Sequence, residues 1–335
     1  MNNSTIRIAQ LGVKNHGQTM LRAATEAGNL RLVSLCDTDV RAAEKAAKEY
    51  NVPVSQSYKD ILHDPKIDAV SLVTPNHLHA EEVLKAAEAG KHVFVEKPMS
   101  MTVSEGRKII AAMQKSGLVL MVGHNTRRRR VFRRAKQLLL GKRIGEIVAV
   151  EMNVSRPAGI QPGLPEWKAD PEKCPLLPMT QLGIHFIDTI EYLLAPIQRV
   201  SCFAASMIMT GGVLDTSSAL FQLSNGTPVA LSSSYVTPDV YYVQIYGTEG
   251  VLRCNSLSLK LDRLEKNGTS NVIEESFETE GAESYVLEMR EFGDCILTGR
   301  QPETGGTEGL RAVAVVEAML KSLHTKCVVE INDVI

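Results

Sequence analysis

A short glycine loop near the start of the chain has the residue types that bind a dinucleotide. An apolar run, Ile6 to Leu11, leads into Gly12-Val13-Lys14-Asn15-His16-Gly17, and the next apolar run ends in Asp37, about 20 residues after the loop. Glycines here allow a tight turn and close helix packing, and an acid at this distance holds ribose hydroxyls. The pattern predicts a cofactor site that includes Gly12, Lys14, Asn15, His16, Gly17 and Asp37.

The loop departs from the usual pattern, because Lys14 stands where a second glycine is expected. Lys14 either crowds the cofactor or points sideways and offers a positive charge to a phosphate. The simpler alternative is that the glycines only make a tight turn and that Asp37 caps the next helix. The acid predicts NAD rather than NADP, since the 2′-phosphate of NADP would meet Asp37 as a like charge. Arg41, one helical turn further on, leaves the use of both cofactors open.

The elements that must position this loop alternate between strand and helix. Strands are predicted at 6–11, 32–36, 68–73, 92–95 and 118–122, and helices at 17–27, 40–50, 78–89 and from the Thr102–Glu105 capping box to 116. This alternation predicts a doubly wound parallel sheet with helices on both faces. Because 335 residues exceed what one core usually serves, we expect two domains, 1–123 and 124–335.

The second part of the chain has a different texture, with longer strands joined by turns. Strands are predicted at 147–154, 199–207, 217–223, 228–235, 241–246 and 250–262, and helices at 183–194, 285–297 and 307–323. Turns at Asn225-Gly226 and at 247–250 are typical of hairpins. These features predict an α+β domain built on a large, mostly antiparallel sheet.

The bulk composition limits the possible partners and the compartment. With 37 basic and 38 acidic side chains, the net charge of −1 provides no overall field for nucleic acid or a membrane surface. No apolar run approaches the roughly 20 residues of a membrane span, and the N-terminal sequence does not have the pattern of an export signal. Six widely spaced cysteines predict reduced thiols and no zinc framework, so we expect a cytoplasmic protein without a metal.

Three further segments complete a recognisable pattern. They are Thr74-Pro75-Asn76-His77-Leu78-His79, Glu96-Lys97-Pro98 at a strand end, and Gly183-Ile184-His185-Phe186-Ile187-Asp188. Together with the glycine loop and the β-rich second part, they resemble the Gfo/Idh/MocA family of nicotinamide-dependent oxidoreductases over essentially the whole chain. The resemblance implies a Rossmann domain, a C-terminal domain with an open sheet, and substrates that are sugars, cyclitols or their derivatives. It also implies homodimers or homotetramers built through that sheet.

The same resemblance assigns catalytic roles to Lys97 and His185. Many members have an aspartate four residues before this histidine, whereas this chain has Gln181. An amide there can hydrogen-bond a substrate hydroxyl or His185, but it favours a protonated histidine less than an aspartate does. We expect His185 to act as the acid/base and Lys97 to stabilise the alkoxide while the nicotinamide accepts hydride. Taken alone, His185 would be read as a core histidine.

Other residues are candidates for the cofactor site because they follow predicted strands. The cofactor site is expected to include Thr74, Pro75, Asn76, His79, Glu96, Lys97 and Arg127. Asn76 either bonds the cofactor or caps the next helix, and the pair His77 and His79 is not expected to bind a metal. Arg127 begins a basic run that ends at Lys136; the run is expected to be mostly a solvated helix balanced by acids elsewhere, with Arg127 or Arg128 reaching a substrate or cofactor phosphate. A cis Lys97–Pro98 bond is a further hypothesis.

The substrate is expected to contact Lys97, Gln181, His185 and Trp167. Trp167, the single tryptophan, either anchors a proline-rich loop or offers a flat platform to a sugar ring. An NAD-assisted glycoside hydrolase or lyase that acts through a transient keto-sugar is the alternative enzyme. A non-catalytic cofactor sensor is the third class, and the presence of both Lys97 and His185 argues against it.

Overall fold

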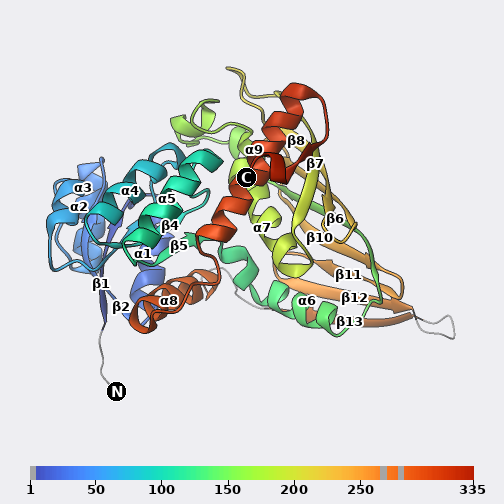
Figure 1. Ribbon diagram of the computed structural model, residues 1–335, viewed down its shortest axis with the longest axis horizontal. Coiled ribbons are helices and arrows are strands. Elements are labelled where there is room, and N and C mark those ends of the chain that lie inside the picture. Colours follow the sequence, from blue (N-terminus) through green and yellow to red (C-terminus); the bar gives the residue numbers. More distant parts are fainter. Residues whose placement is uncertain (1–4, 265–269, 278–282) are drawn as a thin grey trace. The chain divides into compact units, whose positions relative to one another are not determined.

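A computed structural model describes residues 5–264, 270–277 and 283–335 (Figure 1). Backbone contacts divide the chain into two compact units. The first unit is Met1–Asn125 with Gly281–Val313, and the second is Thr126–Glu280 with Ala314–Ile335. The first division lies close to the expected boundary at 123, but the expected continuous second domain is wrong for 281–313. Helix α8 (Glu283–Thr298) belongs to the first unit because Met289 and Phe292 lie in the same buried cluster as Ile8 and Met20.

The first unit contains the predicted parallel sheet, which has five strands in the described residues. They are β1 (Ile6–Leu11), β2 (Leu30–Cys36), β3 (Ala69–Leu72), β4 (His92–Glu96) and β5 (Leu120–Gly123), in the order β2-β1-β3-β4-β5. Every pairing is parallel. The carboxyl ends of these strands therefore lie along one edge of the sheet, where doubly wound folds bind ligands.

The helices of the first unit follow the predicted alternation. They are α1 (His16–Glu26), α2 (Val40–Tyr50), α3 (Tyr58–His63), α4 (His79–Glu88) and α5 (Val103–Lys115), with the short η1 (Asn76–Leu78). Thr102 and Glu105 form the predicted capping box of α5. The short α3 was not predicted; its N-cap is Ser57, whose side chain accepts a hydrogen bond from Asp60 N.

The second unit is built on a nine-stranded sheet within the described residues. The strands are β6 (Ile147–Ser155), β7 (Ile197–Ala205), β8 (Thr216–Leu223), β9 (Pro228–Ser234), β10 (Val240–Gly247), β11 (Gly250–Cys254), β12 (Ser258–Leu264), β13 (Ser270–Ser276) and β14 (Val329–Glu330). Their order is β13-β12-β11-β10-β6-β9-β8-β7-β14, and β6 and β9 form the parallel pair in an otherwise antiparallel sheet. The prediction of a large, mostly antiparallel sheet is confirmed.

One strand prediction in this sheet is wrong. The expected single strand 250–262 is the hairpin β11–β12, because the side chain of Asn255 accepts hydrogen bonds from Leu257 N and Ser258 N and turns the chain. Strands β13 and β14 were not predicted. β13 has only two apolar residues, Val272 and Ile273, and is mostly exposed, so its hydrophobic pattern is weak.

The second unit contains three longer helices among its described residues. They are α6 (Arg130–Leu140), α7 (Ile184–Leu193) and α9 (Gly306–Thr325), whose first part belongs to the first unit. Shorter turns are η2 (Asn125–Arg128), η3 (Pro157–Gly159), η4 (Glu166–Ala169), the π-turn η5 (Met179–Gly183) and η6 (Ile331–Asp333). Phe186 on α7 packs edge-on against Phe132 on α6 and Tyr241 on β10, so one aromatic ring links these three elements.

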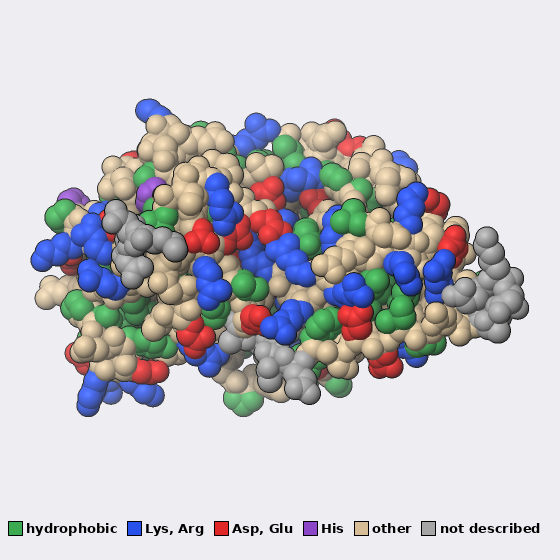
Figure 2. Space-filling model, turned by 90° about the horizontal axis from the view of Figure 1, so that it is seen from below, with side chains coloured by type: hydrophobic (Ala, Val, Ile, Leu, Met, Phe, Trp, Pro, Cys, Tyr) green, Lys and Arg blue, Asp and Glu red, His purple; other side chains and the backbone are tan. Residues whose placement is uncertain are grey.

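The surface agrees with the balanced composition. Basic and acidic side chains are interspersed on the face shown in Figure 2. Among the residues that the structure describes, no helix has both the length and the apolar composition needed to cross a membrane. None of the six cysteines, all of which lie in the described part of the chain, is in a disulfide.

Candidate cofactor site and catalytic residues

The glycine loop after β1 is a tight turn whose backbone requires both glycines. Gly12 has a φ of +82°, and a Cβ at this position would collide with the backbone oxygen of Val73. A Cβ on Gly17 would collide with the backbone oxygen of Gly12. Gln10, buried in β1, donates its amide to the oxygens of Gly12 and Gly17, each at 2.9 Å. Sequence reasoning missed Gln10, although an amide inside an apolar strand was a signal.

Asp37 fastens this loop to the end of β2. Its Oδ2 accepts from Val13 N at 2.8 Å, and its Oδ1 accepts from Asp39 N at 2.9 Å. The cap of α2 comes from Asp39, which accepts from Ala42 N, and not from Asp37. Lys14 points to the side and forms an exposed ion pair with Asp39 at 3.3 Å. Asp37 therefore lies beside the loop with its charge directed at backbone donors.

The loop after β3 contains a buried amide that the protein leaves unsatisfied. Asn76 is 3% exposed, and its Nδ2 has no hydrogen-bond partner among the described residues. No side chain caps η1 or α4, so Asn76 does not act as the alternative N-cap. An unpaired buried donor costs about 1–3 kcal/mol. A ligand oxygen at this position would remove that cost, which fits a bound dinucleotide.

Thr74 in the same loop is tied to a carboxyl group on α4. Its Oγ1 donates to Glu82 Oε2 at 2.5 Å. Burial raises the pKa of Glu82 to about 7, although the bond from Thr74 acts in the opposite direction. This loop is therefore attached to a carboxyl group that changes its charge near neutral pH.

Glu96, at the end of β4, is a buried carboxylate next to Lys97. Its Oε1 lies 2.9 Å from Nε2 of His16, and its Oε2 accepts from Lys97 N at 3.3 Å. Burial alone would raise the pKa of Glu96, but the charge and hydrogen bond of His16 outweigh it, and the pKa lies below its usual value. A Cβ on Gly123 of β5 would lie 2.9 Å from Oε1, so this glycine makes room for the carboxylate.

His79 faces backbone oxygens with both ring nitrogens. It is fully buried, with Nδ1 2.7 Å from Pro98 O and Nε2 2.9 Å from Thr74 O. Burial lowers the pKa of His79, while the two carbonyl contacts and the charge of Glu96 act in the opposite direction. The Lys97–Pro98 bond is cis, which confirms that hypothesis. The ring of His79 thus contacts the protein where the sequence suggested a cofactor contact.

In the second unit, His185 is the second residue of α7, directly after the π-turn η5. Gln181 lies in that turn, is 6% exposed, and donates its Nε2 to Cys174 Sγ at 3.5 Å. Single π-turns are rare and occur often at functional sites. Gln181 and His185 therefore both lie at the irregular start of helix α7.

Arg127 has a partner that the sequence analysis did not anticipate. Its Nε and Nη2 donate to the two carboxylate oxygens of Asp188, at 2.9 and 2.5 Å, and both side chains are buried. Asp188 is the last residue of the motif that contains His185. A bidentate buried pair explains Arg127 without a cofactor phosphate, and it anchors η2 to α7.

Three further residues of the basic run, Arg133, Arg134 and Lys136, also have side-chain hydrogen bonds. Arg133 donates to the hydroxyl of Tyr192 at 2.9 Å, and Lys136 donates to Tyr192 O and Leu193 O at the end of α7. Arg134 forms a bidentate pair with Glu275. Cations at a helix carboxyl end are stabilising, so the run holds α6 against α7. The Arg134–Glu275 pair agrees with the expected balance by acids elsewhere, whereas the contacts of Arg133 and Lys136 with α7 were not anticipated.

Trp167 lies in a small core of the proline-rich loop. Its half-buried ring packs against a cluster formed by Cys174, Leu177, Val213 and Tyr235. The ammonium of Lys168 lies 5.3 Å from the ring centre. These contacts are those of a loop anchor, one of the two alternatives for this residue.

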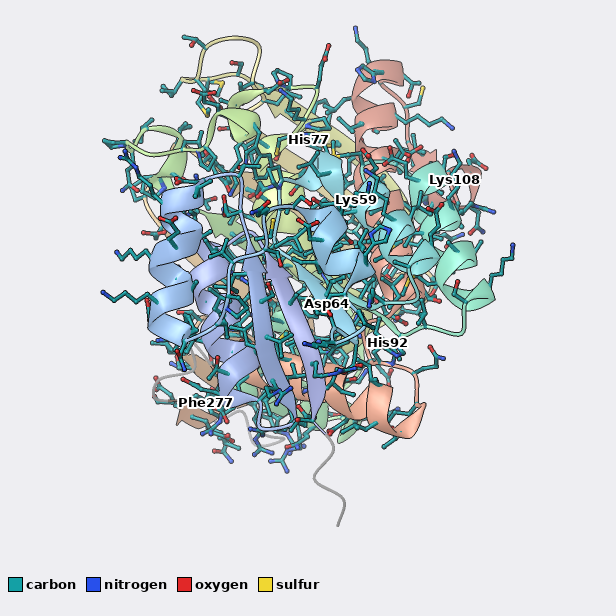
Figure 3. All side chains as sticks on the ribbon, turned by 90° about the vertical axis from the view of Figure 1, so that its left-hand side faces the viewer. Lys59, Asp64, His77, His92, Lys108 and Phe277 are labelled. Atoms are coloured by element: carbon teal, nitrogen blue, oxygen red, sulfur yellow. The ribbon has the colours of Figure 1, made fainter. Side chains whose placement is uncertain are left out.

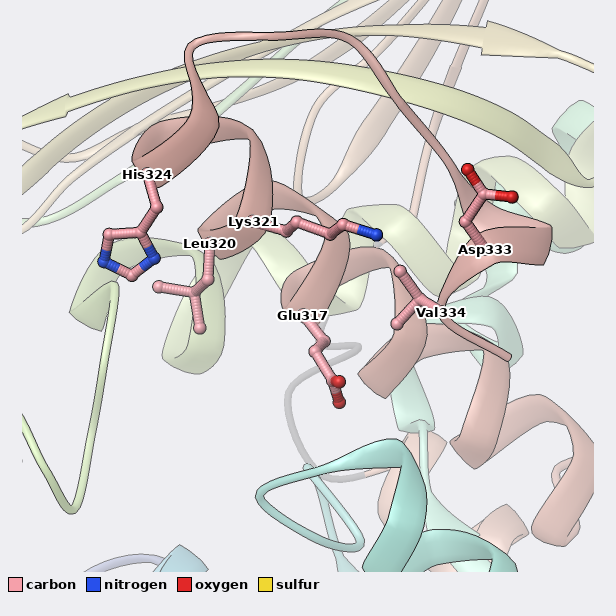
Figure 4. A pocket seen from close by; sticks show the side chains of 6 residues that line it. All are labelled: Glu317, Leu320, Lys321, His324, Asp333 and Val334. Atoms are coloured by element: carbon pink, nitrogen blue, oxygen red, sulfur yellow. The ribbon is translucent and has the colours of Figure 1, made fainter.

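A surface depression elsewhere has a different lining. It has a volume of about 420 Å³ and is formed by the end of α9 and the C-terminal turn (Figure 4). Its lining residues are Glu317, Leu320, Lys321, His324, Asp333 and Val334. None of these residues was a candidate for the site, and we assign no ligand to this depression.

Comparison with known families matches both parts of the chain. A model described as an oxidoreductase family with an NAD-binding Rossmann fold matches residues 6–124. A model of the GFO/IDH/MocA C-terminal domain matches residues 132–253.

Relatives with known names cover nearly the whole chain. A D-xylose 1-dehydrogenase (NADP(+)) of Haloferax volcanii is 26% identical, over 96% of this chain and 98% of that protein. A scyllo-inositol 2-dehydrogenase (NAD(+)) of Bacillus subtilis is 27% identical, over 89% of this chain and 88% of that protein.

Solved structures show the same fold. A levoglucosan dehydrogenase in complex with NADH and levoglucosan has a TM-score of 0.90 at 20% identity, covering 98% of this chain and 100% of that one. An oxidoreductase domain protein from Kribbella flavida also has a TM-score of 0.90, at 22% identity, covering 98% of this chain and 99% of that one.

Proposed function

Because the chain belongs to the GFO/IDH/MocA family of oxidoreductases, we propose that it transfers hydride between NAD and a ring secondary alcohol of a sugar, cyclitol or glycoside. The observation that carries this proposal is the carboxyl edge of the parallel sheet. There the Gly12 loop follows β1, the unpaired amide of Asn76 follows β3, and Lys97 follows β4. Ligands of doubly wound folds bind at this edge.

The chain's own groups suit a dinucleotide. Backbone N–H groups of the Gly12 loop, where α1 begins without an acidic residue in its first turn, would hold the pyrophosphate. Asp37 would accept from the ribose hydroxyls, and its charge supports NAD over NADP. Asn76 would donate its free amide to a cofactor oxygen, with Thr74, Pro75 and Glu96 beside it. Named relatives use either cofactor, so Asp37 is the residue on which the proposed preference depends.

In the proposed chemistry, one residue transfers the hydroxyl proton and another stabilises the hydroxyl oxygen. His185 removes the hydroxyl proton as the alcohol is oxidised and returns it in the reverse direction. Lys97 donates a hydrogen bond to the oxygen and stabilises its developing negative charge. When bound, the nicotinamide supplies the hydride acceptor. Gln181 bonds a substrate hydroxyl, and the uncovered part of the Trp167 ring contacts the sugar.

Assembly through the open sheet is the second part of the proposal. Phe203 on β7 is 75% exposed and Leu220 on β8 is 63% exposed, and both point to the same face of the sheet. A homodimer or homotetramer would cover them. A Phe203→Glu and Leu220→Glu double variant is expected to reduce the molar mass measured by light scattering. A wild-type monomer would contradict this part.

The six cysteines, none of which is in a disulfide, support a cytoplasmic location.

The activity is tested by following NADH formation with NAD and a panel of sugars and cyclitols. We expect turnover for at least one of them, and Lys97→Met to remove it while NADH binding, measured by fluorescence, is retained. Failure of the wild type to bind NADH would contradict the proposal. Turnover of a chromogenic glycoside without net NADH would instead support the NAD-assisted hydrolase.

A further inference from the structure

His79 joins two loops that follow neighbouring strands. Its Nδ1 faces Pro98 O at 2.7 Å, in the segment after β4, and its Nε2 faces Thr74 O at 2.9 Å, in the loop after β3. Strands β3 and β4 are adjacent in the sheet. One buried ring therefore links the two segments at the edge where the proposed cofactor binds.

The two linked segments carry the groups that the proposed reaction uses. The Thr74 loop holds Asn76, whose amide is unpaired, and Pro98 directly follows Lys97. The ring of His79 is fully buried and has no third nitrogen to offer a ligand. Any effect of His79 on the reaction must therefore pass through the backbone it holds.

We propose that His79, at the start of α4, is a positioning residue for Lys97, because its Nδ1 holds the backbone at Pro98 and so fixes the direction of the lysine side chain. This inference rests on the proposed function. Small displacements of a catalytic group lower the rate steeply, by as much as about 100-fold for about 1 Å. The chain around Lys97 is held from the other side by Glu96, which bonds to His16. His79 and Glu96 thus both attach to this segment, at Pro98 O and at Lys97 N.

Two conservative variants separate the two contacts. In His79→Asn, the side-chain amide lies where Nδ1 was and can still donate to Pro98 O. In His79→Gln, the longer side chain places its amide where Nε2 was, so the bond to Thr74 O is retained and that to Pro98 O is lost. The pair therefore tests whether the contact with Pro98 controls Lys97.

His92 provides a matched control in the same strand. It begins β4 at the opposite edge of the sheet, and its Nδ1 accepts from Val119 N at 3.0 Å. Figure 3 shows His92 well separated from His77, which lies in the same loop as Thr74. His92→Gln removes a partly buried histidine without touching the Lys97 segment, so it measures the cost of general destabilisation.

The experiment measures kcat and KM, the Kd of NADH by fluorescence, thermal unfolding, and hydrogen exchange of the peptide that contains 97–101. We expect His79→Gln to lower kcat about 10-fold or more and to speed exchange in 97–101, with the Kd of NADH changed less than kcat. His79→Asn is expected to keep kcat and the exchange rate near those of the wild type. His92→Gln is expected to lower thermal stability alone.

Equal effects of both His79 variants on kcat, or a loss of kcat that follows thermal stability in all three variants, would overturn the proposal. Unchanged exchange of 97–101 in His79→Gln would also overturn it. If the wild type oxidises none of the sugars, the proposed function fails, but hydrogen exchange and NADH binding still decide whether His79 holds this segment.

Discussion

The raised pKa of Glu82 predicts how the stability of the protein depends on pH. It is partly buried on α4, accepts a hydrogen bond from Thr74, and its burial raises its pKa to about 7 from a usual value of 4.5. The folded protein therefore binds this proton more tightly than the unfolded chain does. By linkage, the contribution of Glu82 to stability is fully present below about pH 4.5 and is lost as the pH rises through about 7.

The size of this effect follows from the difference between the two pKa values. At about 1.4 kcal/mol for each pKa unit, a difference of about 2.5 units corresponds to about 3.4 kcal/mol over the full range. Between pH 5 and pH 8 the part that titrates is about 2.5 kcal/mol. Glu82→Gln cannot ionise and keeps an oxygen that can accept from Thr74, so we expect it to be more stable than the wild type at pH 8.

The assay is urea unfolding of the wild type and the variant at pH 5 and pH 8, with the difference between the two proteins compared across pH. Glu81→Gln is the matched control, because Glu81 is the preceding residue of α4, is fully exposed, and has its pKa lowered by Lys85. We expect that variant to lack the gain at high pH. If the stability of Glu82→Gln fell with pH as steeply as that of the wild type, the burial argument for Glu82 would be refuted.

Two further predictions concern close packing and a buried charge. Gly123→Ala places a methyl group against the carboxylate of Glu96; we expect a loss of about 1–3 kcal/mol in unfolding experiments and weaker NADH binding by fluorescence, and unchanged stability would contradict the role of this glycine in making room for the carboxylate. Arg127→Met removes the guanidinium that pairs with the buried carboxylate of Asp188 and is expected to cost about 3–5 kcal/mol in urea unfolding, whereas adding Asp188→Leu should restore most of that loss. A double variant as unstable as Arg127→Met would show that the pair does not act as a unit.

Local sequence patterns predicted the elements that position the site. The alternation of apolar strands with capped helices gave the parallel sheet, because the period and the cap chemistry are set by residues within a few positions of one another. The positions of Gly12 and Asp37 after β1 and β2 follow from the same pattern. Strand β13 was missed because its residues are mostly exposed and leave little hydrophobic signal.

Interactions between distant positions could not be predicted in this way. Helix α8 belongs to the first unit because Met289 and Phe292 share a buried cluster with residues of β1 and α1. The sequence of α8 does not by itself indicate that the helix packs against these elements. An arginine near a glycine loop suggests a phosphate ligand, and the pairing of Arg127 with Asp188, far along the chain, could not be anticipated from the sequence. A charge has many possible partners in a sequence, and packing selects one.

The motif residues of this chain therefore divide into two groups by what their side chains contact. Asn76 keeps an unpaired buried donor, which suits a ligand, whereas His79 has both nitrogens directed at backbone oxygens. Asp188 likewise serves an internal pair, three residues from His185. A motif thus includes residues that hold the backbone as well as residues that meet the ligand. Since a replacement of either kind can abolish activity, only measurements that separate binding, rate and local exchange can assign a motif residue to one group.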